Sequence, residues 1–124
     1  MRRVWEHRTI APGPSAHDRF RAFEVRPCGA HPLVAGLQSF TLEDELYWRQ
    51  HGSEPIEPLL TARSDETGTD EPLAWAYEVE GGRVVQSLLG HSAKTYEPGP
   101  MRAFARRVIA WCARRAIHGP AGEA

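Results

Sequence analysis

The clearest pattern along the chain is an alternation of large apolar residues with small or polar ones over positions 73–79. Leu, Trp, Tyr and Val occupy every second position there, which is typical of a strand with one more apolar face. Gly81-Gly82 follows and predicts a tight hairpin turn, because glycine adopts positive φ at little cost. A second strand is predicted over 83–89. It ends at Gly90-His91, a place where functional side chains often lie, because a rigid strand leads there into an exposed loop.

Three further segments have weaker patterns. Residues 20–26 alternate and predict a strand. Residues 55–62 predict another strand, and their two prolines restrict it to a sheet edge or to its second half, because proline cannot donate to the ladder. Within residues 40–48, a threonine followed three positions later by an aspartate fits a capping box, which would begin a short helix.

The final element is the clearest helix. Pro98 and Pro100 suit its first turn, and Gly119-Pro120 is expected to end it. Apolar residues fall on one face at helical spacing, namely Met101, Phe104, Ala105, Val108, Ile109, Trp111 and Cys112. Arginines lie largely elsewhere, at Arg102, Arg106, Arg107, Arg114 and Arg115. We interpret these arginines as a solvated face, with the last two favoured by the dipole at the helix end.

The composition limits the classes of function. A chain of 124 residues, 41% apolar and 25% charged, suits one globular domain. The net charge of −1 gives no reason to expect nucleic acid or an anionic membrane as partner. No apolar run approaches the ~18–20 residues of a membrane span, and the first residues lack the apolar region of a signal peptide. Cys28 and Cys112 match no redox or zinc motif, so a reduced, cytoplasmic setting is the simpler expectation.

Several residues could carry chemistry at the ends of the predicted strands. We expect His31, Glu45 and His91 to converge there, with Asp44 nearby. Such a set could hold a divalent metal or act as acid and base on a sugar. The structural alternative is that the two histidines only cap turns by hydrogen bonding. The remaining histidines, His7, His17, His51 and His118, are interpreted as solvated surface residues.

The spacing around Glu45 favours this carboxylate as the reactive one. Asp44 and Glu45 would point to opposite sides of an extended segment, whereas Glu45 and Tyr47 share a side. With Trp48 or Trp75 nearby to stack on a ring, this arrangement would suit a sugar; the alternative is that both tryptophans are core aromatics. Nucleophilic chemistry is not expected, since neither cysteine lies on a glycine-flanked strand-to-helix turn.

Three separated motifs carry a resemblance to a known family. They are the segment His31-Pro32-Leu33-Val34-Ala35-Gly36-Leu37 with Phe40 and Asp44-Glu45-Leu46-Tyr47, the stretch from Pro72 through Trp75 and Gly82-Arg83-Val84 to Leu89-Gly90-His91, and Ala110-Trp111. Their order and spacing resemble the ThuA-like (trehalose utilisation) family of the class I glutamine amidotransferase-like superfamily. The resemblance runs from about residue 5 to residue 111, but only over the C-terminal part of the family's domain.

The resemblance implies an α/β fold, the C-terminal portion of a flavodoxin-like or glutamine amidotransferase-like domain. Short strands, a closing hairpin and one C-terminal helix are expected. It also implies a loop leading to a short strand around 45–48, which we favour over the helix. The domain organisation expected is an extended arm over 1–19, a partial ThuA-like domain over 20–118 and a flexible tail over 119–124.

The resemblance further implies a role with trehalose or related disaccharides, including their 3-keto forms. If the chain is an enzyme, we expect Glu45 and His91 to do the acid/base work, with Tyr47 and His31 positioning the sugar. Asp44 and Arg83 are further candidates for substrate binding, although for Arg83 a structural pairing with Glu80 is favoured. The alternative is a non-catalytic binding or assembly module, completed by a second copy or by a partner chain that supplies the absent half of the domain.

Overall fold

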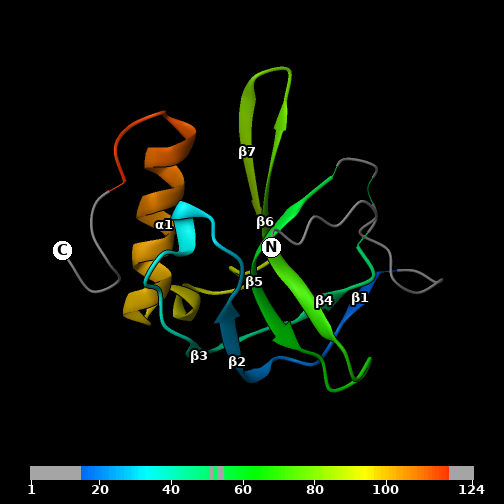
Figure 1. Cartoon of the computed structure of the whole chain (residues 1–124). Coiled ribbons are helices and arrows are strands. Elements are labelled where there is room, and N and C mark those ends of the chain that lie inside the picture. The colour runs from blue at the N-terminus through cyan, green and yellow to red at the C-terminus, as the bar shows by residue number, and fades with distance from the viewer. Residues whose placement is uncertain (1–14, 51, 53–54, 118–124) are drawn as a thin grey trace.

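The computed structural model describes residues 15–50, 52 and 55–117 of the chain (Figure 1). The elements of this part are β1 (Ala16–His17), β2 (Arg21–Pro27), η1 (Pro32–Val34), β3 (Phe40–Asp44), β4 (Tyr47–Trp48), β5 (Glu57–Arg63), β6 (Asp70–Val79), β7 (Gly82–Ser87), η2 (Ala93–Tyr96) and α1 (Gly99–Cys112). None of its helices is long and apolar enough to cross a membrane.

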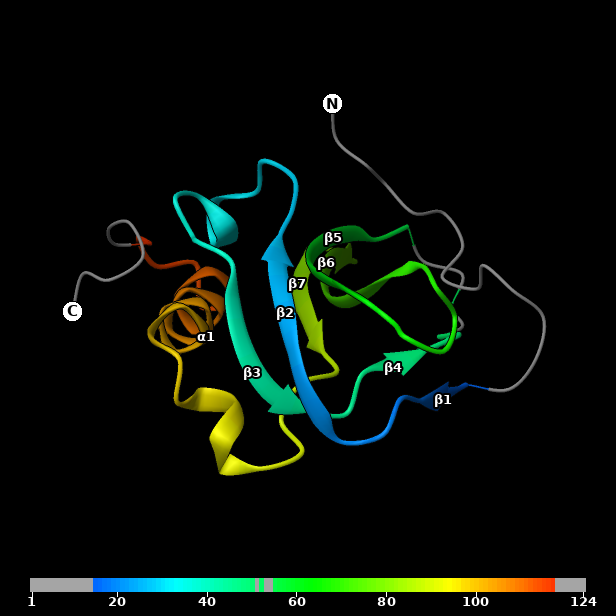
Figure 2. The same ribbon diagram turned by 90° about the horizontal axis from the view of Figure 1, so that it is seen from below.

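Five strands form one sheet in the order β3-β2-β5-β6-β7, and β1 and β4 form a separate pair. Every strand pair in the described chain is antiparallel. The sheet is curled, and α1 lies on one side of it against β7, η1 and η2 (Figure 2). The β1–β4 pair lies at the opposite side of the molecule. The expected α/β fold with one C-terminal helix is confirmed.

The core lies between the curled sheet and α1. Along β2 and β3 the buried residues alternate with exposed ones, because successive side chains of a strand point to opposite faces. The middle of β6 differs, since residues 71–76 are all buried and neither face of the strand is exposed there. Phe104 and Met101 of α1 and Leu33 of η1 complete the core from the other side. Each such side chain contributes about 1.5–3 kcal/mol of burial free energy.

The predicted hairpin of β6 and β7 is confirmed, with one correction to its turn. Val79 pairs with Gly82, so the two turn residues are Glu80 and Gly81 rather than Gly81 and Gly82. Both have positive φ, 51° at Glu80 and 80° at Gly81, as a type I′ turn requires. The hairpin projects from the sheet (Figure 1).

The segment over residues 40–48 forms neither a helix nor a leading loop. Residues 40–44 form β3, in which Phe40, Leu42 and Asp44 are buried and alternate with exposed residues. This period of two outweighs the capping-box pattern, because pairing with β2 buries that whole face. The short strand expected at the end of this segment is present as β4.

The strand expected over 55–62 is β5, and it lies inside the sheet between β2 and β6. Its pairing with β2 involves only Leu60 and Thr61, which belong to its second half. Pro58 lies in the first half, opposite Trp75 of β6 and next to a register irregularity. As expected, the prolines restrict the pairing to the second half of the strand. Hydrogen-bonded neighbours on both sides, β2 and β6, begin only after Pro58.

The final helix ends earlier than expected and faces differently. It stops at Cys112, whereas the expected stop at residues 119–120 lies outside the described part. Ile109 is 71% exposed and Cys112 is exposed, so neither belongs to the buried face. Arg107 is buried instead, and its guanidinium donates to the carbonyl oxygens of Leu33 and Ala35 at 3.3 and 2.8 Å. These hydrogen bonds lie where α1 packs against η1. Arg107 is therefore not part of a solvated face.

The expected arm over 1–19 and tail over 119–124 fall largely outside the described residues. Within the part of the arm that is described, β1 pairs with β4, with Ala16 opposite Trp48 and His17 opposite Tyr47. The next residue, Asp18, is buried.

Candidate functional site

The structure brings together three of the predicted site residues around one carboxylate oxygen. Tyr47 donates its phenol proton to Glu45 Oε2 over 2.8 Å. The Nδ1 atom of His91 lies 3.6 Å from the same oxygen. Glu45 is only 16% exposed at its side chain, whereas His91 is 50% exposed. A carboxylate, a phenol and an imidazole that meet at one oxygen can exchange protons.

Asp44 holds the loop that supplies His91. Its Oδ2 accepts from the backbone N–H of Gly90 at 2.8 Å and from Thr95 Oγ1 at 2.6 Å. Its Oδ1 accepts from the N–H groups of Glu45 and His91 at 2.7 and 3.3 Å. Asp44 is fully buried, whereas the side chain of Glu45 is 16% exposed. The Asp44 carboxylate therefore positions the loop, and no face of it is open to a substrate.

A second histidine, His17, lies at the same carboxylate and was missed from the sequence. Its Nε2 is 3.5 Å from Glu45 Oε2, and its ring centroid is 4.9 Å from that of Tyr47. The pairing of β1 with β4 sets this position, since His17 is opposite Tyr47. Strand partners 30 residues apart leave no local signal, so the sequence alone gave no reason to separate His17 from the surface histidines.

Asp18 fixes the strand that carries His17. Its Oδ1 accepts from Ser64 Oγ at 2.7 Å and from Trp48 Nε1 at 3.1 Å, and its Oδ2 accepts from Arg21 and from the backbone of Asp65, both at 3.0 Å. Burial by itself raises the pKa of this carboxyl group, but these four hydrogen bonds outweigh it. The pKa of Asp18 therefore lies below its ordinary value of 3.8.

Tyr47 is held in its protonated form. Its hydrogen bond to Glu45 raises the pKa of the phenol above its ordinary value of 10.0. Burial and the negative charges of Glu45 and Asp44 act in the same direction. At neutral pH the phenol is thus a donor that fixes the orientation of the Glu45 carboxylate.

An open hollow of about 510 Å³ lies beside this cluster. Its lining consists of Ser15, Tyr47, Gln50, Leu88, Leu89, Gly90 and His91. The two tryptophans considered for ring stacking do not contribute to it. Trp48 is buried with its indole on Asp18, and Trp75 is buried with its indole donating to Gln86 Oε1 at 2.9 Å. Both are core aromatics, as the structural alternative held.

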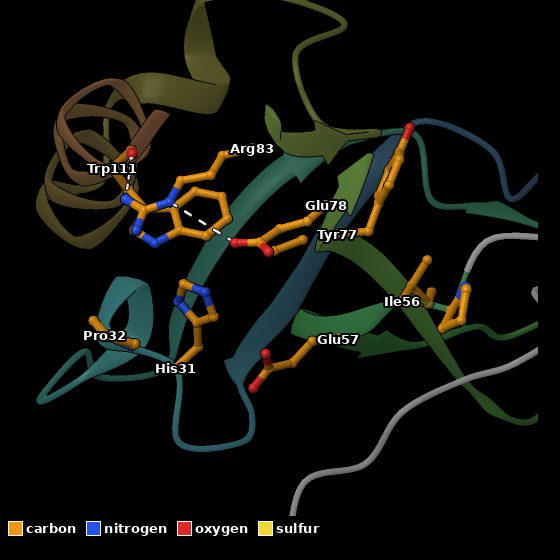
Figure 3. A pocket seen from close by; sticks show the side chains of 10 residues that line it. His31, Pro32, Ile56, Glu57, Tyr77, Glu78, Arg83 and Trp111 are labelled. Atoms are coloured by element: carbon orange, nitrogen blue, oxygen red, sulfur yellow. Dashed lines mark hydrogen bonds and ion pairs between the residues drawn. The ribbon is translucent and has the colours of Figure 1, made fainter. Parts of the chain in front are cut away.

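His31 and Arg83 lie elsewhere, in a second hollow of about 520 Å³ shared with Trp111, Glu57 and Glu78 (Figure 3). The Nδ1 of His31 accepts from the N–H of Leu33 at 3.1 Å, and its ring meets the edge of Trp111 at 5.0 Å. His31 therefore caps the turn that begins η1, and the expected convergence of His31 with Glu45 and His91 is not realised. In the described chain no group of three or more His, Cys, Asp or Glu side chains is arranged to hold a metal ion.

Arg83 joins the hairpin to the end of α1. It donates to the carbonyl oxygen of Trp111 at 2.9 Å, and its guanidinium lies 4.8 Å from the centre of that indole ring. Its Nε is 3.9 Å from Glu78 Oε1, so the acidic partner is Glu78 and not the expected Glu80 (Figure 3). These contacts serve packing between two elements.

Comparison with known proteins shows the family of this chain. The family model for trehalose utilisation, ThuA, matches residues 4–112. The chain belongs to the ThuA family. A solved structure of a ThuA-like protein from Parabacteroides merdae ATCC 43184 superposes on this ThuA chain with a TM-score of 0.73 at 25% sequence identity. The match covers 86% of this chain and 44% of that one, so the present chain spans less than half of that protein's length. No curated protein matches the chain.

Proposed function

We propose that this ThuA chain acts in carbohydrate metabolism, with Glu45 and His91 as acid and base toward trehalose or a related keto-disaccharide. The observation that carries the proposal is the meeting of Tyr47, His91 and His17 at one oxygen of Glu45, beside an open hollow. The family description, trehalose utilisation, supports the choice of a sugar. The chain is expected to act in the reducing cytoplasm, because Cys28 and Cys112 match no redox or zinc motif.

The chemistry follows from how exposed each group is. Glu45 is mostly shielded and hydrogen-bonded by Tyr47, so its orientation is fixed. His91 is half exposed and lines the hollow, so its ring reaches both a bound sugar and solvent. A carboxyl group oriented in this way can take a proton from a sugar hydroxyl or give one to a leaving oxygen, and the imidazole can restore its protonation state.

The test compares purified variants on trehalose and on a 3-keto-disaccharide. Glu45→Gln and His91→Ala are each expected to lower turnover by about 10²- to 10⁴-fold while the circular dichroism spectrum and thermal melt stay as in the wild type. Glu24→Gln is the matched control, because Glu24 is an exposed glutamate on β2, remote in register from the site. Wild-type activity in both site variants would remove Glu45 and His91 from the chemistry.

A second candidate function is a binding or assembly module that a second copy or a partner chain completes. Two observations favour it. The chain matches only 44% of the ThuA-like protein from Parabacteroides merdae, and β7 is an edge strand of the described sheet. An edge strand offers backbone groups to another strand. Sugar binding that appears only when a partner is added, seen together with a larger species on a sizing column, would support this role, and turnover by the isolated chain would eliminate it.

A further inference from the structure

The hydrogen bonds of His17 determine which of its ring nitrogens carries the proton. Its Nδ1 lies 2.6 Å from the backbone carbonyl oxygen of Asp18. A carbonyl oxygen only accepts hydrogen bonds, so Nδ1 must be the donor. In the neutral ring the other nitrogen, Nε2, then has a lone pair and no proton. That lone pair lies 3.5 Å from Glu45 Oε2.

A lone pair and a carboxylate oxygen at this distance repel each other unless one of them carries a proton. The other groups that face Glu45 do not relieve this contact. Tyr47 already donates its single proton to Oε2, His91 reaches the same oxygen by its own Nδ1, and Asp44 is occupied by its own four hydrogen bonds. A proton between Nε2 of His17 and Oε2 of Glu45 would satisfy both atoms.

His17 cannot move away from this contact easily. Its backbone is paired with β4, its ring lies against that of Tyr47, and the following residue, Asp18, is fixed by four side-chain hydrogen bonds and by its own N–H to Leu46 at 2.9 Å. The ring is still 40% exposed, so its nitrogens exchange protons with water.

We propose that His17 is a positioning and proton-exchange residue for Glu45, a role that rests on the proposed function of this site. With the shared proton on Nε2, the ring is an imidazolium and Glu45 is a carboxylate. Transfer of this proton to Oε2 gives a neutral ring and a carboxylic acid, so the total charge of the pair is unchanged. When Glu45 passes that proton to a sugar oxygen, the exposed neutral ring takes up a proton from hydronium or a buffer acid in the solvent, and the pair is restored.

The proton placement can be measured without any substrate. A long-range ¹H–¹⁵N correlation spectrum of the imidazole rings in mildly alkaline buffer distinguishes the two neutral tautomers. Neutral His17, assigned by the loss of its signals in His17→Asn, is expected as the Nδ1–H tautomer. His31 is the internal control, because its Nδ1 accepts from the N–H of Leu33 and so requires the Nε2–H tautomer. A neutral His17 protonated at Nε2 would overturn the inference.

Turnover separates proton exchange from a purely structural role. His17→Asn retains an amide N–H where Nδ1 donates to Asp18 but has no group in place of Nε2. This variant is expected to fold normally, to lose about ten- to a hundredfold in kcat/KM, and to show a pH profile of kcat/KM that differs in shape from that of the wild type. An equal loss at every pH overturns the proton-exchange role. If the wild-type chain turns over no sugar, the proposed function fails, and the exchange role of His17 fails with it, whichever tautomer is found. If the wild-type chain turns over sugar but neutral His17 is the Nε2–H tautomer, only the inference about His17 is lost.

Discussion

At the scale of single residues, three polar side chains of the described chain meet at one carboxylate oxygen. Glu45 Oε2 accepts from Tyr47 at 2.8 Å and has an imidazole nitrogen on two sides, at 3.5 and 3.6 Å. The three groups come from β1, β4 and the loop before η2. A carboxyl group surrounded in this way has its orientation fixed before any ligand arrives, which is what acid/base work at a defined atom requires.

The coupling between Tyr47 and Glu45 predicts a measurable change in titration. Glu45→Gln removes the charge and weakens the acceptor that hold the pKa of Tyr47 above 10.0, so the pKa of this phenol should fall toward that value. Phenolate absorbance followed against pH gives the result, with Tyr47→Phe used to identify the Tyr47 component. Glu24→Gln should leave the curve unchanged, and an unchanged curve in Glu45→Gln would contradict the hydrogen bond described here.

The sequence could predict the local half of this site. Glu45 and Tyr47 are two residues apart, and an extended backbone places them on one side whatever the rest of the fold does. His91 was indicated by its place at the end of a predicted strand. His17 could not be found, because its distance to Glu45 depends on the pairing of β1 with β4. For His31 the sequence left two roles open, and the turn-capping alternative is the one that the structure shows, with the N–H of Leu33 donating to its ring.

At the scale of elements, the turn of the β6–β7 hairpin lies one residue earlier than its two glycines suggest. Two adjacent glycines indicated the turn, but the register places Glu80 at its first position. Glu80 has a φ of 51°, a conformation that suits asparagine and glycine better than glutamate. The glycine at position 82 instead opens β7, where a Cβ atom would lie 3.2 Å from the carbonyl oxygen of Val79.

This geometry predicts that Glu80→Asn stabilises the chain. Asn-Gly is the favoured pair of a type I′ turn, so a gain of about 0.5–1 kcal/mol in the free energy of unfolding is expected. Gly81→Ala is the opposing control. A Cβ there meets no atom within 4 Å, so its expected loss of about 1 kcal/mol comes from the φ of 80° alone. Urea unfolding measures both, and a destabilised Glu80→Asn would show that Glu80 is held by a side-chain role and not merely tolerated.

The final helix illustrates what periodicity can and cannot indicate. The positions of Met101 and Phe104 on its buried face follow from helical spacing. Arg107 has the same spacing and was excluded because of its charge. It is buried because the carbonyl oxygens of Leu33 and Ala35 accept from its guanidinium, and these acceptors lie more than 70 residues away. A charged residue at the spacing of an apolar face can therefore be buried where a distant segment supplies hydrogen-bond acceptors.

At the scale of the whole molecule, two buried carboxylates connect segments that the sheet alone does not hold. Asp44 joins β3 to the loop before η2, and Asp18 joins β1 to β4, to the start of β2 and to the turn between β5 and β6. Each carboxylate also fixes a histidine that lies beside Glu45. Asp44 accepts from the N–H of His91, and Asp18 is the residue that follows His17. Folding and the assembly of the site therefore depend on the same charges.

Asp18 makes this dependence testable through pH. Its folded-state pKa lies below the ordinary 3.8, so its stabilising contribution is complete above that value and is lost as the pH falls through the lower, folded-state pKa. Asp18→Asn should cost about 3 kcal/mol in the free energy of unfolding at neutral pH, and the gap to the wild type should narrow as the pH is lowered below about 4. Asp65→Asn is the control, since its side chain is 73% exposed and its ion pair with Arg21 lies at the surface. Urea unfolding across the acid range measures all three chains. A gap for Asp18→Asn that stays constant down to the lowest pH would mean that the charge of Asp18 does not hold β1 in place, and the position of His17 would then need another cause.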